Sequence, residues 1–199
     1  MSCSSTIIED ISQYCDGSEQ LAYGYFFFDG RDSQKGLQRY EDLLRSLIWQ
    51  FSTRSHEVPP ALYELYEQCN SGIQQPTLEA LRSTFPLVLA GFQNVYLILD
   101  ALDECADQIK LLNWIKEMAG WNVGKLHFLA TSRQERDIEV RLQALSPISV
   151  CLEGDAVHLD IETYLDRMLQ DDDEAMAWNR DEYIREHVKT SLLKGAHGM

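Results

Sequence analysis

The segment Asn94–Cys105 reads NVYLILDALDEC, and it decides the fold expected for this chain. Its opening NVYLIL is nearly continuous in apolar residues and lacks the alternation of a strand with one face in water. Such a run predicts a strand buried on both faces, as in the middle of a parallel sheet. The run ends at Asp100, and two further acids, Asp103 and Glu104, follow closely.

On either side of this strand, expected strands and helices alternate along the chain. Further short strands are predicted at Leu21–Asp29, Lys125–Thr131 and Ile148–Leu152. Helices are predicted at Thr6–Tyr14, Leu37–Phe51, Ala61–Cys69, Pro76–Ala90, Asp107–Ala119 and Glu135–Leu145. The alternation indicates an α/β fold with a parallel sheet and helices on both faces. From His158 the pattern is helical, so we expect an α/β core over residues 1–153 and a helical subdomain beginning at 154–199.

The carboxylates come where the central strand ends, which is the edge at which open parallel sheets bind ligands. Asp100 at this edge could hold Mg²⁺ through water molecules, because Mg²⁺ keeps much of its hydration shell. Asp103 or Glu104 could polarise a water molecule against a phosphoryl group. Alternatively, the acids could simply cap the next helix. That second interpretation is favoured for an isolated strand that ends in aspartate.

The next predicted strand also ends in polar residues, and these favour a phosphoryl-transfer site over a simple helix cap. Thr131, Ser132 and Arg133 follow its apolar run. The planar fork of an arginine suits a terminal phosphate. Carboxylates, a bound metal and an arginine at one sheet edge are the parts of a phosphoryl-transfer site. A metal hydrolase that uses the acids alone is disfavoured, because no histidine accompanies them in the sequence.

Composition limits the partners of the chain. With 17 basic and 32 acidic residues, the formal charge is −15, which argues against binding to nucleic acid or an anionic membrane. No apolar run approaches the roughly 18 residues that a membrane span needs. The five cysteines are widely separated, and we expect them to be reduced thiols of a cytoplasmic protein.

Several motifs resemble one family of nucleotide-binding proteins. LILDALDE is similar to the Walker B segment of NACHT-type STAND signal-transduction NTPases, with Ala101 as the small residue after the metal-binding aspartate. HFLATSRQERDIE resembles the sensor strand of that family, with Arg133 as the sensor arginine. YGYFFFD, LLRSLIWQF and KGAHGM are similar to the fungal heterokaryon-incompatibility and nephrocystin-3-like N-terminal groups. The resemblance covers nearly the whole chain.

The resemblance implies a P-loop NTPase type of sheet and a switch that ATP or GTP controls. Mg²⁺ would bind at Asp100, Asp103 and Glu104 would be catalytic, and Thr131, Ser132 and Arg133 would contact the nucleotide. Bound nucleotide would control self-association and signalling, and any hydrolysis would be slow. Repeat or effector domains would be further partners in the intact protein.

The phosphate loop that such an enzyme needs, G-x-x-x-x-G-K-[ST], does not occur in the sequence. The resemblance places this loop and its central strand just before Ser4–Asp10, so we expect a truncated core with little nucleotide affinity. Three explanations stay open: a fragment of a larger NTPase, which we favour, a degenerate paralogue acting as a non-catalytic interaction module, or a protein that takes the missing strand from a partner.

Overall fold

The computed structural model describes residues 3–31, 36–55, 57–121, 124–145, 148–150, 161–168 and 186–192. The chain divides into two compact units, Met1–Ser146 and Pro147–Met199. In the second unit, helices are described at 161–168 and 186–192, and Lys189 lies 2.9 Å from both Glu162 and Asp166. Among the described helices, none combines the length and the apolar character that crossing a membrane requires.

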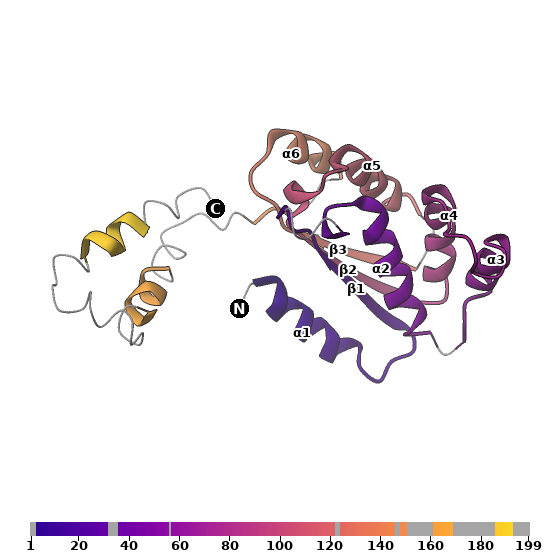
Figure 1. Ribbon diagram of the computed structural model, residues 1–199. Coiled ribbons are helices and arrows are strands. Elements are labelled where there is room, and N and C mark those ends of the chain that lie inside the picture. The colour runs from indigo at the N-terminus through magenta and orange to yellow at the C-terminus, as the bar shows by residue number, and fades with distance from the viewer. Residues whose placement is uncertain are drawn as a thin grey trace. The chain divides into compact units, whose positions relative to one another are not determined.

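The first unit is built on a three-stranded parallel sheet, and NVYLILD is its central strand (Figure 1). The strands are β1 (Leu21–Phe27), β2 (Asn94–Asp100) and β3 (Lys125–Ala130), in the order β1-β2-β3. β2 bonds to a neighbour on each side, and its apolar residues are mostly buried. The α/β class, the parallel sheet and the central position of NVYLILD are therefore confirmed.

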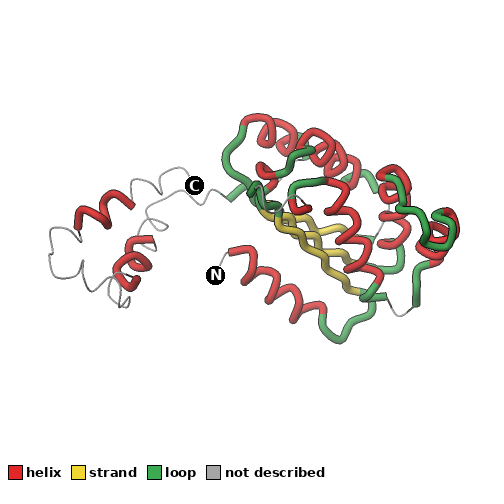
Figure 2. Tube along the Cα trace, in the orientation of Figure 1, coloured by secondary structure: helices red, strands yellow, loops and turns green. Residues whose placement is uncertain are grey.

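Helices cover both faces of the sheet, as predicted (Figures 1 and 2). Helix α1 (Cys3–Cys15) lies on one face, where Tyr14 contacts Tyr96 edge to face. Helix α2 (Tyr40–Ser52) lies on the other face and buries one side against it. Its Phe51 packs so close to β1 that a Cβ on Gly24 would lie 2.6 Å from the ring, so only glycine fits there without repacking.

The remaining helices fall close to their predicted positions. They are α3 (Pro60–Gln68), α4 (Leu78–Leu89), α5 (Gln108–Met118) and α6 (Arg136–Gln143). In α4, the Thr77 hydroxyl accepts a hydrogen bond from the Ala80 amide, which caps the first turn. The short 3₁₀ turn η2 (Leu102–Glu104) stands where the sequence predicts a loop. The apolar sides of the helices complete the core between α2, α4, α5 and the sheet.

One strand prediction is wrong where the structure can test it. Ile148–Val150 form no strand, and the side chains of Ile148 and Val150 are exposed by 97% and 75%. An apolar run becomes a strand only where a neighbouring strand satisfies its backbone groups, and the described sheet contains β1, β2 and β3 with no fourth strand. Residues 151–152 of the expected strand, and most of the expected helical pattern between 158 and 188, lie outside the described residues.

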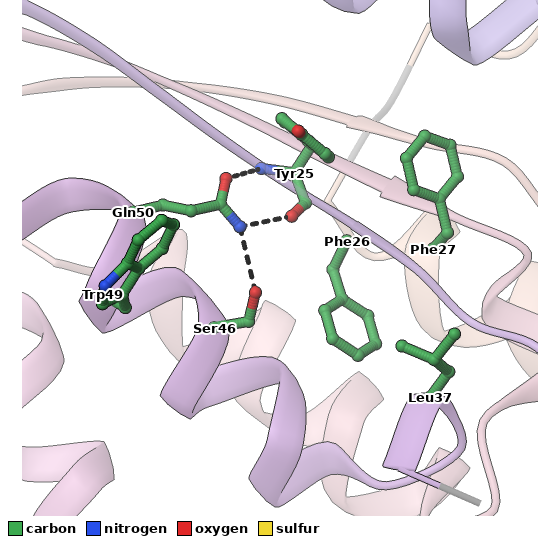
Figure 3. Close-up of a pocket in the computed structure, with 7 residues that line it drawn as sticks. All are labelled: Tyr25, Phe26, Phe27, Leu37, Ser46, Trp49 and Gln50. Carbon is green, nitrogen blue, oxygen red and sulfur yellow. Dashed lines mark hydrogen bonds between the residues drawn. The ribbon is translucent and has the colours of Figure 1, made fainter. Parts of the chain in front are cut away.

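The outer edge of β1 is closed by a side chain. The Gln50 carboxamide on α2 accepts a hydrogen bond from the Tyr25 amide at 3.1 Å and donates one to the Tyr25 carbonyl at 2.8 Å (Figure 3). It also donates to the Ser46 hydroxyl at 3.0 Å. Gln50 is 7% exposed. Its amide therefore takes the place that a peptide group of a further strand would occupy.

We predict that Gln50→Leu lowers the free energy of unfolding by about 1–3 kcal/mol, because the Tyr25 amide and carbonyl lose their partners. Ser46→Ala is the matched control, since it removes one bond to Gln50 and leaves the contacts to Tyr25. It should cost less than about 1 kcal/mol. Urea unfolding followed by circular dichroism measures both. Equal costs for the two variants would contradict the edge-closing role of Gln50.

Candidate functional site

At the carboxyl edge of the sheet, Asp100 joins three segments of the chain. Asp100 ends β2, and its Oδ1 accepts a hydrogen bond from the Ser4 hydroxyl at 2.7 Å. The same oxygen accepts a short hydrogen bond from the Thr131 hydroxyl, just beyond β3. Ser4 is buried in the first turn of α1. The carboxylate thus lies between the N-terminus of α1 and the end of β3.

A left-handed turn follows Asp100 and sets the direction of the next acids. Ala101 has φ 57°, a conformation that a residue with a Cβ adopts at some cost. Its amide donates to the Thr131 hydroxyl oxygen at 3.0 Å. The turn buries Leu102 in the core and places Asp103 and Glu104 on η2, above the strand ends.

Asp103 binds the segment that follows β3. Its Oδ1 accepts hydrogen bonds from the Arg133 amide at 3.0 Å and from the Ser132 hydroxyl at 3.3 Å. Its side chain is only 7% exposed, and its Oδ2 lies 3.6 Å from the Arg133 Nε. Asp103 therefore holds both the backbone and the guanidinium of Arg133.

Glu104 binds the loop that follows β1. Its Oε2 accepts a hydrogen bond from the Gly30 amide at 2.6 Å, and its Oε1 lies 3.8 Å from the Arg133 guanidinium. In the same loop, Arg31 bonds to Asp29, and these bonds hold the pKa of Asp29 at about 2. The three acids of the DALDE segment together thus contact three parts of the chain along one edge: the start of α1, the loop after β1 and the segment after β3.

Arg133 is an exposed cation at this edge. Its side chain is 62% exposed and lies beside both Asp103 and Glu104. Ion pairs at this exposure contribute little to stability, so an incoming anion could compete for the guanidinium at small cost. Cys105, by contrast, is buried, and burial raises the pKa of its thiol to about 11. It therefore offers no nucleophile here at neutral pH.

Every residue singled out from the sequence lies at this one edge, including Thr131 and Ser132. Two contacts were not anticipated, namely those of Ser4 and Gly30. Ser4 gave no signal beyond its place before an apolar helix, and Gly30 indicated only a turn. No group of three ligating side chains suited to a metal ion occurs within the described ranges. Asp100 could therefore hold a cation only together with water or a ligand.

Comparisons with known proteins give one family. The family described as nephrocystin 3, N-terminal matches residues 2–133, a range that contains α1, the sheet, the acidic edge and Arg133. No curated protein and no solved structure matches the chain.

We predict that Thr131→Val destabilises the chain by about 1–3 kcal/mol, because Asp100 loses a donor and the Ala101 amide loses its acceptor. Thr131→Ser keeps the hydroxyl and should cost less than about 1 kcal/mol, the value of one methyl group. Urea unfolding gives both values. Hydrogen exchange at the Ala101 amide should become faster in the valine variant alone. Equal exchange in both variants would show that the Thr131 hydroxyl does not hold this turn.

Proposed function

Because the chain belongs to the nephrocystin 3 N-terminal family, we propose that its carboxyl edge is the Mg²⁺ side of a nucleotide site of the NACHT and P-loop NTPase kind. The observation that carries the proposal is the convergence on Asp100 of the α1 N-terminus and Thr131, with Arg133 on the adjoining segment. In the intact protein, bound ATP or GTP would control self-association and signalling.

Asp100 and α1 supply the groups that a Mg²⁺–polyphosphate needs. Asp100 uses Oδ1 for its two hydroxyl partners, and its Oδ2 accepts no hydrogen bond from a described residue, so Oδ2 can take a water molecule bound to Mg²⁺. The first turn of α1 carries no acidic side chain. The amides and the positive end of the helix dipole there favour a negatively charged ligand.

Arg133 is the group that would contact a terminal phosphate. A phosphate offers the planar guanidinium of Arg133 two acceptor oxygens, and it carries more negative charge than one carboxylate does. In the structure, Asp103 and Glu104 hold Arg133 close to the end of the sheet. Asp103 thereby positions the arginine. Glu104 keeps one carboxylate oxygen beside Arg133 and can orient a water molecule for slow hydrolysis.

A second candidate function is a non-catalytic interaction module derived from this fold. Two observations favour it. Asp103 and Glu104 both bind backbone amides, so they already have structural roles. The sequence also contains no G-x-x-x-x-G-K-[ST] loop to donate hydrogen bonds to a polyphosphate. Each charge-assisted hydrogen bond that is missing weakens the binding free energy by about 1.5–3 kcal/mol. A loss of 1.4 kcal/mol is tenfold in affinity, so the 199 residues alone should bind nucleotide weakly.

We predict that calorimetry of the chain with Mg²⁺–ATP or Mg²⁺–GTP detects no micromolar binding. Millimolar nucleotide should still shift the amide NMR signals of Ala101, Thr131 and Arg133, because the half-site remains. Asp100→Ala and Arg133→Ala should each abolish these shifts. Arg141→Ala is the matched control, since it removes an arginine of α6 that contacts Asn113 instead of the acids.

Two results would separate the candidate functions. Shifts that persist in both Asp100→Ala and Arg133→Ala would show that these residues have no part in binding nucleotide. An absence of any shift in the wild-type chain at millimolar nucleotide would favour the interaction module.

A further inference from the structure

Helix α3 contributes little to the core and presents most of its surface to water. Leu65 is the one buried residue of its nine, and α3 packs against α4, beside which Figure 1 shows it. The side chains of Tyr63 and Tyr66 are exposed by 64% and 51%. The structure describes residues 57–121 without a gap, so no undescribed residue interrupts this part of the chain.

A strained turn follows α3. Asn70 and Ser71 have φ angles of 55° and 53°, and Gly72 has a φ of 82°. This left-handed backbone costs free energy at Asn70 and Ser71, because each carries a Cβ. The Gln74 amide closes the turn by donating to the Cys69 carbonyl at 2.9 Å. The chain thus holds an unfavourable conformation at the end of a helix that adds little to the core.

The turn brings Ile73 to the tyrosines of α3. The Tyr66 ring lies against Gly72, where an added Cβ would lie 2.7 Å from a ring carbon, so only glycine leaves room for the ring in this position. Ile73 follows directly and is 80% exposed. Tyr63 lies one helical turn before Tyr66, on the same side of α3. Two aromatic rings and an isoleucine thus lie close together in water.

Two carboxylates accompany these apolar side chains. Glu64 and Glu67 are exposed on α3, and Glu67 lies one helical turn after Tyr63. Neither carboxylate forms an ion pair with a described residue. The sequence has no lysine or arginine between Arg54 and Arg82. We call the following set the α3 surface: Tyr63, Glu64, Tyr66, Glu67 and Ile73.

We propose that the α3 surface docks an arginine-containing basic segment of another protein. A guanidinium group stacks on aromatic rings and pairs with carboxylates, and the α3 surface offers both within about one helical turn. The apolar part of the surface covers the aliphatic stem of the same arginine. This inference rests on the α3 surface alone and is independent of the proposed nucleotide site.

Charge complementarity selects this partner over others. Nucleic acid and anionic membranes carry negative charge, which Glu64 and Glu67 repel. A second copy of the chain would bring the same carboxylates to the contact, together with its own formal charge of −15. A basic segment is attracted by this charge, which also raises its rate of association.

NMR titration of the whole chain with two peptides, hexa-arginine and hexalysine, tests the proposal. The two probes carry equal charge, so a general attraction to the acidic chain acts on both. We expect hexa-arginine to shift the amide signals of residues 63–73 first. It should bind at least about twofold more tightly than hexalysine, because lysine lacks the planar group that stacks on tyrosine.

Tyr63→Ala should weaken the binding of hexa-arginine by about two- to fivefold, the range expected for an exposed cation–π contact. Trp49→Ala is the matched control, because it removes a similarly exposed ring from α2 and should leave the affinity unchanged. Glu64→Gln combined with Glu67→Gln should weaken the binding of both peptides, since both lose the carboxylates.

Three results would overturn the proposal. The first is a set of shifts spread over the acidic chain with no preference for residues 63–73. The second is equal weakening by Tyr63→Ala and Trp49→Ala, or equal affinity for the two peptides. The third is binding of phosphatidylserine vesicles at residues 63–73 in place of hexa-arginine, which would assign the α3 surface to a membrane.

Discussion

The carboxylate of Asp100 is the point on which the arrangement of the first unit depends. One oxygen of this group accepts hydrogen bonds from Ser4 on α1 and from Thr131 after β3, while the residue itself ends β2. Charge-assisted hydrogen bonds of this kind are about twice as strong as neutral ones. They fix the start of α1 against the strand ends, and this fixed position is what makes the edge a candidate ligand site.

The neighbouring acids, Asp103 and Glu104, also hold separate segments together by accepting hydrogen bonds along this edge. Asp103 holds the Arg133 amide and Glu104 holds the Gly30 amide, so the loops after β3 and β1 are both bound to η2. A ligand that attracts Arg133 would change the surroundings of both acids at once. The coupling between a bound anion and the two loops would then pass through side chains in direct contact.

Much of this fold could be predicted from the sequence, and the exceptions have physical reasons. NVYLILD is a strand at the expected bounds, because an apolar run of 7 residues is too short for a buried helix and has the length of a strand buried on both faces. The partners of Ser4, Gly30 and Gln50 could not be predicted, because they depend on how distant segments meet. Ile148–Val150 has the composition of a strand and fails to form one, since pairing depends on a neighbour that the local sequence does not specify.

The most direct test of a Mg²⁺–nucleotide half-site at Asp100 is paramagnetic relaxation by Mn²⁺ in the presence of ATP. We predict that the amide signals of Ala101 and Ser132 broaden first, and that Asp100→Ala removes this broadening. Broadening spread over the acidic surface of the chain, with no preference for this edge and no effect of Asp100→Ala, would contradict a Mg²⁺–nucleotide half-site at Asp100.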